Sequence, residues 1–392
     1  MSVWVILNPT KIRSVEALRT QVESIAHSCG VTHIHWLMTS QEDPGTGQAI
    51  EAAQAGANIV IAAGGDGTVR AVAAGLADTN VRMGILPLGT GNLMARNLGI
   101  PLDDVAKAFK ITVGAGHRRV DLGWLRMEAQ DAPALLPAEG KLVHHAYNIW
   151  AGTSRAPAQP EEMPADDEFS FLVISGLGFD GKTMADTDPQ LKKRFGWIAY
   201  VVAALGALSV PRMKVKLRLH EPCSPKETRA SAWENADPHE EAASQAQIYQ
   251  ANNVGFQEKS ATRIRPDEDV DVMARCVFFA NCGQLPFVTL AADASVDDGL
   301  IDVAVVDTVA GLVGWANLAG KIFAQGLGIR PVNTAMSLGR IVFRQARGAD
   351  VSVDQAQIVQ VDGDAVGRAR RIHVRIQRAA VDIAAPVGNG RF

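Results

Sequence analysis

Hydrophobic and polar positions along the first third of the chain follow two alternating periods, one typical of strands and one typical of helices. Apolar runs at 3–8 and 31–38 predict strands, and the apolar stripe from Val15 to Ile25 predicts a helix between them that ends at Gly30. The same alternation continues through helix 48–54, strand 59–63, helix 68–76, strand 82–87 and a helix that ends near residue 112. This order predicts βαβ units, in which helices cover a parallel sheet.

Beyond about residue 117 the pattern changes to a period of two, which predicts strands with one buried face. Runs of this kind lie at 214–219, 272–280, 301–306, 359–361 and 372–376. Strands that alternate in this way are typical of antiparallel sheets. We therefore predict an α/β domain over residues 1–117, followed by a mostly antiparallel, β-rich second domain over residues 118–392.

Two stretches interrupt the predicted second domain. Residues from about 126 to 168 and from about 220 to 250 are dense in Ala, Pro, Glu and Asp and show little periodicity. Because segments of low hydrophobicity bury too little surface to offset the entropy of ordering, we expect flexible surface insertions there. Helical segments are expected in the same domain at 191–208 and 312–324.

The composition is that of a globular protein. The chain has 392 residues, of which 47% are hydrophobic and 20% charged, enough for about two domains with cores of their own. The net charge of -4 gives no reason to expect a nucleic-acid partner. The four cysteines are scattered, so neither a zinc site nor a disulfide framework is expected, and a reducing cytoplasm fits best. The first residues predict a strand and not a signal peptide.

The predicted strand at 59–63 ends in a glycine turn with one carboxylate at its centre, Gly64-Gly65-Asp66-Gly67-Thr68. Glycines lack a Cβ, so they can adopt positive φ and let backbone N–H groups approach a ligand closely. The start of the following helix adds unpaired donors and a dipole that favours anions. We therefore predict a nucleotide-phosphate site in which Asp66 holds a cation against the phosphates. A dinucleotide fingerprint would need a third glycine where Arg70 stands, and a P-loop would need Gly-Lys-Ser/Thr.

A second glycine turn, Leu88-Gly89-Thr90-Gly91-Asn92, follows the next predicted strand. In open α/β sheets ligands bind outside the carboxyl ends of the strands, so neighbouring parallel strands place both turns along one crevice. Thr90 and Asn92 are the polar side chains that this turn offers. Alone, such a turn is equally explained as a helix cap, but beside the first turn it strengthens the prediction of a phosphate site.

These turns and several later motifs resemble the catalytic domain of diacylglycerol kinases and related lipid kinases. The other matching motifs, in the expected order, are Asn8-Pro9, Ala95–Pro101, Asp121-Leu122-Gly123, Ser175–Asp180, Asp297–Asp302 and Asp362-Gly363-Asp364. Several separated motifs in one order are far more specific than any one of them. The chain also departs from the family pattern: Thr10-Lys11 replaces a small or Gly-containing stretch, Arg70-Ala71 replaces Asn-Glu, and Asp364 replaces a Glu.

The resemblance implies ATP and Mg²⁺ as cofactors and an active site in the cleft between an α/β nucleotide-binding domain and the β-rich domain. The residues implied for nucleotide binding are Asn8, Thr39, Gly64, Gly65, Asp66, Gly67, Thr68, Gly89, Thr90 and Asn92. Asp364 is implied as the base that accepts the proton of the attacking hydroxyl. From the residues alone, the Asp-Gly pair before it is also a strong hairpin signal.

The resemblance implies two metal positions. One is Asp66, and the other is a structural Mg²⁺ site made by Asp298 with the backbone carbonyls of Ser295 and Leu300. Carboxylate and carbonyl oxygens are hard ligands that suit Mg²⁺. A capped turn explains the acidic cluster at 297–299 equally well.

A basic edge with two aromatic residues precedes an apolar segment, 198–208, that is too short to span a bilayer. The edge includes Lys192, Lys193, Arg194 and Trp197. Basic residues attract anionic headgroups and Trp favours the membrane interface, so we expect peripheral contact with the inner face of the membrane here. A buried helix of the second domain also explains the apolar segment.

The function predicted from these features is that of a cytoplasmic lipid kinase that transfers the γ-phosphate of ATP to a lipid hydroxyl, with diacylglycerol as the first choice of acceptor. A sphingoid base or another glycerolipid stays open as acceptor, and a homodimer stays open as assembly. An NAD kinase is the rival enzyme, because that family also uses Gly-Gly-Asp-Gly, but the second glycine turn and the later motifs argue against it. A nucleotide-binding sensor without turnover is the alternative from another class, favoured by Arg70, Ala71 and Asp364.

Overall fold

The structure of the chain is a computed structural model. It describes residues 1–130, 133–150, 163–179, 212–223, 266–285, 288–289, 295–308 and 339–387. The predicted membrane-facing residues Lys192, Lys193, Arg194 and Trp197 lie outside these ranges. So do the helical segments predicted at 191–208 and 312–324 and most of the insertion predicted at 220–250.

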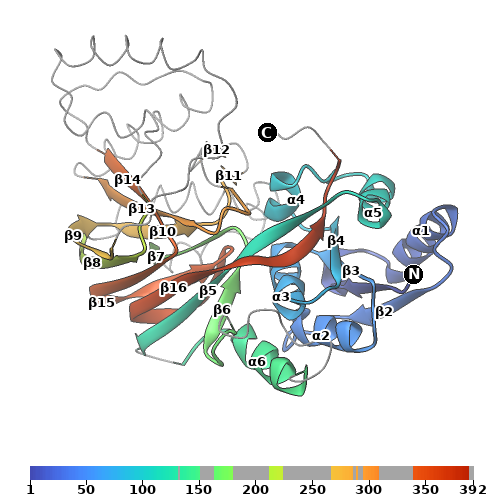
Figure 1. Ribbon diagram of the computed structural model, residues 1–392, viewed down its shortest axis with the longest axis horizontal. Coiled ribbons are helices and arrows are strands. Elements are labelled where there is room, and N and C mark those ends of the chain that lie inside the picture. The colour runs from blue at the N-terminus through green and yellow to red at the C-terminus, as the bar shows by residue number, and fades with distance from the viewer. Residues whose placement is uncertain are drawn as a thin grey trace, which may run out of the picture.

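Four parallel strands form the sheet of the N-terminal part, in the order β4-β3-β1-β2 (Figure 1). Strands and helices alternate along the chain as β1 (Val3–Leu7), α1 (Val15–Ser28), β2 (Ile34–Met38), α2 (Thr46–Gln54), β3 (Ile59–Gly64), α3 (Asp66–Leu76), β4 (Arg82–Pro87), α4 (Leu93–Asn97) and α5 (Val105–Val113). A single 3-10 turn, Pro9–Lys11, follows β1. The predicted βαβ order is confirmed.

Burial explains why these segments take these forms. Every residue of β3 is buried, as expected of a parallel strand covered by helices on both faces. The buried stripe of α1 is Leu18, Val22 and Ala26, at helical spacing, and the Ser14 hydroxyl caps this helix by accepting from the backbone N–H of Ala17 (3.2 Å). Local patterning and capping thus agree along this part of the chain.

The rest of the described chain is β-rich and almost entirely antiparallel. Its elements are β5 (His117–Gln130), α6 (Glu139–Trp150), β6 (Glu168–Phe171), β7 (Ile174–Phe179), β8 (Met213–His220), β9 (Glu268–Ala274), β10 (Cys276–Ala280), β11 (Gln284–Leu285), β12 (Val288–Thr289), β13 (Ile301–Thr308), β14 (Gly339–Ala346), β15 (Gly348–Val361) and β16 (Asp364–Ala384). The predicted fold class, an α/β part followed by a β-rich part, is confirmed, and the predicted boundary at residue 117 falls on the first residue of β5.

The strand β16 joins the two parts into one sheet. It pairs with β15 and β5 in antiparallel fashion, and near its end Asp382 and Ile383 pair in parallel with Arg82 and Met83 of β4. Figure 1 shows β5 and β16 running together from the α/β part into the β-rich part. Both parts are therefore fixed to one another by backbone hydrogen bonds and do not depend on a loose linker.

The expectation of a flexible insertion at about 126–168 was wrong for the described part of that stretch. Strand β5 continues to Gln130, β6 pairs with it, and α6 packs against α2 and α3 (Figure 1). The inward residues of α6 include Glu139, Val143 and Ala146, which are buried and share one helical face. In the sequence, the surrounding Ala and Pro residues make the helical spacing of this short stripe hard to recognise.

The helices of the described part of the chain include none with both the length and the apolar character needed to cross a membrane.

Histidine and carboxylate side chains alternate on the polar face of the β-rich part. Both ring nitrogens of His220 face carboxylates, Nδ1 at 3.0 Å from Asp267 Oδ2 and Nε2 at 3.0 Å from Asp350 Oδ2. Only the imidazolium form can donate from both nitrogens. Burial alone lowers the pKa of His220, but the hydrogen bonds to Asp267 and Asp350 outweigh it and raise the pKa above its ordinary value.

This arrangement predicts a pH dependence of stability. A histidine whose pKa is raised in the folded state contributes stability that is present below its unfolded pKa of 6.5 and is lost as the pH rises through the folded value. We expect the thermal midpoint of the wild type to fall between pH 6 and pH 8, and His220→Gln to flatten that fall. Melting curves at several pH values check this. His33→Gln is the control, because His33 is exposed and has no ion-pair partner among the described residues; an equal flattening by both variants would contradict the assignment.

Candidate active site

The predicted nucleotide-binding residues lie together at one edge of the N-terminal sheet. Asn8 follows β1, Thr39 follows β2, and the two glycine turns follow β3 and β4. The backbone N–H groups of Asn8, Thr39 and Leu88 continue the ladders by donating to Ala63 O (2.9 Å), Leu7 O (3.0 Å) and Gly64 O (2.8 Å). This edge holds the carboxyl ends of all four parallel strands, where open α/β sheets place their ligands.

Asp66 fastens the two glycine turns to each other. Its carboxylate accepts from the backbone N–H of Asn92 at Oδ2 (2.9 Å) and of Leu93 at Oδ1 (2.5 Å), the first groups of α4. Burial raises the pKa of Asp66 to about 6, backbone hydrogen bonds from Leu93 and Asn92 oppose the rise, and Asp362 adds to it. The carboxylate is therefore both the cap of α4 and a charge that lacks a full counter-charge.

The glycines of these turns are required by close backbone approach and not by positive φ, so that part of the prediction was wrong. Gly65 has φ -94°, and the positive-φ residue of the second turn is Asn92, at 48°. A Cβ at Gly89 would lie 2.6 Å from Gly65 Cα, and one at Gly91 would lie 2.5 Å from Asp66 Oδ2. The two turns touch along their backbones, which leaves no room for a side chain at positions 89 and 91.

The polar side chains of the turns hold the loops in shape. The amide of Asn92 spans Gly89 on both sides: its Nδ2 donates to Gly89 O (2.8 Å) and its Oδ1 accepts from Gly89 N–H (3.0 Å). Asn8 Nδ2 donates to Thr68 Oγ1 (3.2 Å), which ties β1 to the start of α3. Thr90 is exposed.

Lys11 brings a cation to the same place. Its Cε lies 3.6 Å from the position that a Cβ on Gly65 would take, and the side chain is exposed. In the sequence, Lys11 is notable only as a departure from the family pattern. Its contact with the glycine turn marks it as a candidate for holding phosphate.

Asp364 reaches this edge from the second domain. It is the first residue of β16 and follows a tight turn in which Asp362 and Gly363 have φ of 46° and 90°. The buried Asp362 carboxylate holds that turn by accepting three backbone N–H bonds, from Leu172 (2.8 Å), Val173 (2.9 Å) and Ile174 (3.0 Å). Burial raises the pKa of Asp362, although Arg70 and these N–H groups oppose the rise.

The Asp364 carboxylate meets the first glycine turn. A Cβ placed on Gly67 would lie 3.2 Å from Asp364 Oδ2, so the acid stands at the N-terminus of α3. Its side chain is 50% exposed. The structure therefore gathers Asp66, Gly67 and Asp364, predicted from motifs far apart in the chain, at one place.

Two further charged residues of this place, besides Lys11, were not predicted as site residues. Arg70 is only 3% exposed, and it pairs with Asp364 Oδ2 through Nη1 (3.1 Å) and with Glu139 Oε1 through Nε (3.3 Å). In the sequence, Arg70 could have been noticed because it is charged and the rest of its helix face is apolar. Glu139 could have been noticed because it lies at helical spacing from Val143 and Ala146. Neither signal by itself indicates a partner.

The second predicted metal position lies in the turn before β13. Asp298 Oδ1 accepts from the backbone N–H of Leu300 (3.0 Å), and Ser295 Oγ donates to Asp297 Oδ1 (2.6 Å). Packing of the turn around the Asp298 carboxyl raises its pKa to about 6, with further contributions from Asp121 and Asp297. The donors are hard oxygens that suit Mg²⁺. In the described ranges no three His, Cys, Asp or Glu side chains converge on a metal position, so the site rests on one carboxylate and carbonyls, and it stays a prediction.

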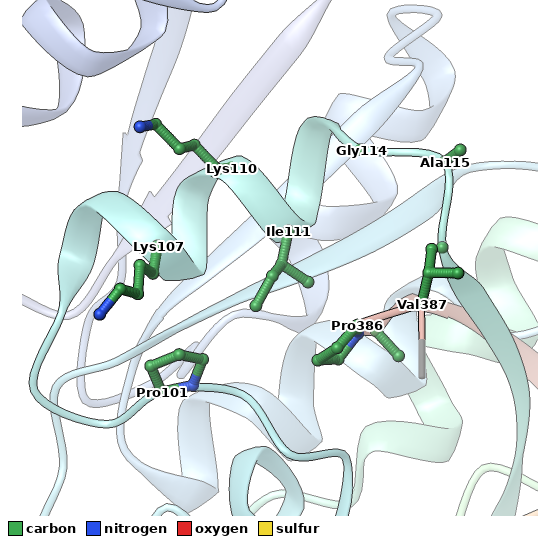
Figure 2. Close-up of a pocket in the computed structure, with 10 residues that line it drawn as sticks. Pro101, Lys107, Lys110, Ile111, Gly114, Ala115, Pro386 and Val387 are labelled. Atoms are coloured by element: carbon green, nitrogen blue, oxygen red, sulfur yellow. The ribbon is translucent and has the colours of Figure 1, made fainter. Parts of the chain in front are cut away.

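A hollow of about 380 Å³ lies elsewhere, between α5 and residues 385–387. None of the predicted site residues lines it. Figure 2 shows Ile111 pointing toward Pro386, while the ammonium groups of Lys107 and Lys110 point away from both. The lining of the hollow is mainly apolar, and the hollow is not part of the candidate site.

The N-terminal part of the chain, which carries the two glycine turns, is similar to known proteins. Residues 2–125 match the family model of the diacylglycerol kinase catalytic domain. The chain is 36% identical over 123 residues to the diacylglycerol kinase of Bacillus subtilis, covering 30% of this chain and 40% of that protein. It is 48% identical over 173 residues to a protein of Cronobacter sakazakii named probable lipid kinase YegS-like, covering 42% of this chain and 44% of that protein. Each match thus spans less than half of the relative.

A solved structure shares the fold over nearly the whole chain. The crystal structure of a diacylglycerol kinase from Bacillus anthracis str. Sterne superposes with a TM-score of 0.58 over 98% of this chain and 97% of that one, at 16% identity. The resemblance drawn from the motifs is confirmed for the N-terminal part by the family match, and the fold of both parts is confirmed by this superposition.

The contact between the two glycine turns predicts unequal effects of the same small substitution. Gly89→Ala forces a methyl group against Gly65 Cα at 2.6 Å, whereas the methyl of Gly65→Ala lies 3.4 Å from Gly89 Cα. We expect Gly89→Ala to cost about 1–3 kcal/mol of stability and to weaken nucleotide binding, and Gly65→Ala to cost less. Calorimetric unfolding and ATP titration of both variants check this, and equal losses would show that the turns do not press on each other.

Proposed function

Because residues 2–125 match the family model of the diacylglycerol kinase catalytic domain, we propose that this protein is a lipid kinase that uses ATP and Mg²⁺ and has diacylglycerol as its acceptor. The observation that carries the proposal is the position of Asp364 beside Gly67, 3.2 Å from where a Cβ on that glycine would lie. An acid from the second domain thus stands at the glycine turn that is suited to phosphate, where a hydroxyl and a phosphate must meet.

The proposed roles follow from the requirements of phosphoryl transfer, which are alignment and neutralisation of charge. The backbone of the glycine turns and the N-terminus of α3 hold the phosphates, and Lys11 adds a positive charge. Asp364 accepts the proton of the lipid hydroxyl. Its exposed side chain is open to an acceptor that arrives from solvent or from a membrane surface.

The charge balance of the site fits a divalent cation. Three carboxylates, those of Glu139, Asp362 and Asp364, act on the buried cation of Arg70, and the charge of Asp362 also acts on Asp66. Each carboxylate oxygen of Asp66 accepts one N–H group and keeps a lone pair for a metal. When bound, Mg²⁺ supplies charge neutralisation for the phosphates, and Asp66 is the residue proposed to hold it.

A second candidate function is a nucleotide-binding sensor without turnover. The observation that favours it is the ion pair between Arg70 and Asp364, because the guanidinium occupies one oxygen of the carboxylate that would have to accept the proton. An NAD kinase is the remaining enzyme alternative. These three functions differ in whether ATP is consumed and in which acceptor gains phosphate.

The first test is transfer of labelled γ-phosphate from ATP to lipid. We expect labelled phosphatidic acid from diacylglycerol in anionic vesicles with Mg²⁺, and no labelled product from NAD. A lipid must be reached at an interface, so changing Lys192, Lys193 and Arg194 together to Ser should reduce the rate, since each basic residue near an anionic surface contributes about 1 kcal/mol.

The outcomes of this test separate the three functions. Labelled NAD without any need for vesicles would overturn the lipid kinase. ATP binding with no labelled product in any tube would support the sensor. Unchanged activity of the triple variant would remove the proposed membrane edge and leave the kinase.

The role of Asp364 predicts a loss of turnover without a loss of nucleotide binding. Removing a general base commonly costs about 10²–10⁴-fold, so Asp364→Asn should depress kcat on that scale while the Kd for ATP is retained. Kinetics at saturating ATP and a separate ATP titration check this. Asp269→Asn is the matched control, because Asp269 also pairs with an arginine, Arg218, but lies exposed on β9. A loss of ATP affinity that equals the loss of rate would assign Asp364 to the nucleotide instead.

A further inference from the structure

Arg70 is a buried arginine at the junction of the two domains. It lies on α3 with 3% of its side chain exposed, and α6 and the turn between β15 and β16 contribute its partners. Burying a charge is costly unless it is paired and hydrogen-bonded. Burial alone lowers the pKa of this guanidinium, but Glu139, Asp364 and Asp362 outweigh it and raise the pKa above its ordinary value. Arg70 is therefore a permanent cation.

One nitrogen of Arg70 holds both ends of the turn that carries Asp364. Nη1 donates to the backbone carbonyl of Val361 (3.0 Å), the last residue of β15, and to Asp364 Oδ2 (3.1 Å), in the first residue of β16. The fork of a guanidinium is planar and rigid, so these two bonds set the carboxylate of Asp364 relative to its own backbone. A free aspartate on an exposed turn would rotate.

The bond to Arg70 occupies one carboxylate oxygen of Asp364, Oδ2, and leaves the other oxygen, Oδ1, available. Oδ1 has no hydrogen-bond partner among the residues that the structure describes, and half of the side chain is exposed. An incoming hydroxyl can therefore approach Oδ1 while Oδ2 remains bound to Arg70.

Glu139 fixes Arg70 from the opposite side. Its Oε1 pairs with Arg70 Nε at 3.3 Å, and its Oε2 accepts from the backbone N–H of Ser170 on β6 (3.2 Å). Burial raises the pKa of Glu139, and the Arg70 cation opposes that rise. The charged groups form one continuous chain from α6, through α3, to the turn at the active-site edge.

We propose that Arg70 is the positioning residue of the catalytic acid, and that Glu139 holds Arg70 in place for this purpose. The inference rests on the proposed function, since it takes Asp364 as the base. It also joins two departures from the family pattern into one feature: the long side chain of Arg70 fills the space beside the short side chain of Asp364. Arg70 does not touch the acceptor, and it acts only through Asp364.

A purely structural role for Arg70, as a fastener between α3 and the second domain, makes a different prediction from a positioning role. If Arg70 only fastens the two parts together, removing it should lower kcat by the same factor whether or not residue 364 can accept a proton. If Arg70 positions the acid, removing it should lower kcat only when residue 364 can accept a proton. A double-mutant cycle measures this difference directly.

The experiment compares the wild type with Arg70→Gln, Asp364→Asn and the double variant, in the full-length protein with ATP and diacylglycerol in anionic vesicles. Displacing a reacting group by about 1 Å can cost about 10²-fold, so we expect Arg70→Gln to lower kcat by about 10- to 100-fold with the KM for ATP unchanged. In the Asp364→Asn background the same change should cost less than twofold. The kcat of Arg70→Lys, which keeps the positive charge but not the planar guanidinium, should lie between those of the wild type and Arg70→Gln.

Arg82→Gln is the matched control. Arg82 also pairs with an aspartate, Asp382, and donates to a carbonyl, Gly114 O (2.9 Å), but it lies at the opposite end of β4 from the glycine turns. Its loss should leave kcat within twofold of the wild type. If Arg70→Gln leaves the buried Glu139 without its counter-charge and fails to fold, Arg70→Gln combined with Glu139→Gln removes both charges and enters the same cycle.

The outcomes distinguish the inference from the function on which it rests. An active wild type with equal losses from Arg70→Gln in both backgrounds, or a loss that lies in the KM for ATP, would overturn the positioning role and leave the lipid kinase. A wild type that transfers no phosphate to lipid would overturn both. Full activity of a folded Arg70→Gln protein would overturn the inference alone.

Discussion

The backbone contact between Gly65 and Gly89 is the constraint on which the rest of the site depends. A Cβ on Gly89 would lie 2.6 Å from Gly65 Cα, so the turns can approach this closely only because position 89 is a glycine. The approach brings the start of α4 within reach of Asp66, whose carboxylate binds the backbone N–H groups of Asn92 and Leu93. The Asp66 carboxylate thus caps α4 and joins the ends of the neighbouring strands β3 and β4. Its charge lies at the glycine turns.

The second domain is held to this edge by a strand and not by a linker. β16 begins at Asp364 beside the glycine turn and ends in parallel pairing with β4. A bulge near Ala379, which has φ 49°, lets this strand change partners. Asp121 stabilises the bulge by accepting from the Ala379 N–H (2.6 Å) and joins it to the turn before β13 by accepting from the Gly299 N–H (2.6 Å). The position of Asp364 therefore follows from sheet pairing that extends through the molecule.

The electrostatics of the site depend on an imbalance of charge: the described residues there include more acidic than basic side chains. Burial raises the pKa values of both Asp66 and Asp362, and the buried cation of Arg70 opposes the rise at Asp362. An excess of buried negative charge costs free energy unless a cation accompanies it. The same excess gives Arg70 its strong hold on the turn of Asp364.

Local patterns in the sequence determined much of the fold. The periodicities of 3.6 and 2 located the βαβ order and the β-rich part, because they depend only on neighbouring residues. They also misplaced some boundaries. The predicted strand at 272–280 is divided into β9 and β10, and the predicted runs at 359–361 and 372–376 are parts of the much longer strands β15 and β16. Edges and lengths depend on partners that pair from elsewhere in the chain.

The candidate site divides in the same way. The sequence by itself determined the glycine turns, Asp66 and the motif that contains Asp364, since each is a short run with its own chemistry. Only the tertiary structure decided that Arg70 meets Glu139, 69 positions away, and Asp364, 294 positions away. It also decided that the glycines serve close approach and not positive φ. The physical reason is that side-chain pairing across a sheet and a helix is set by strand order and register, which no local run of residues contains.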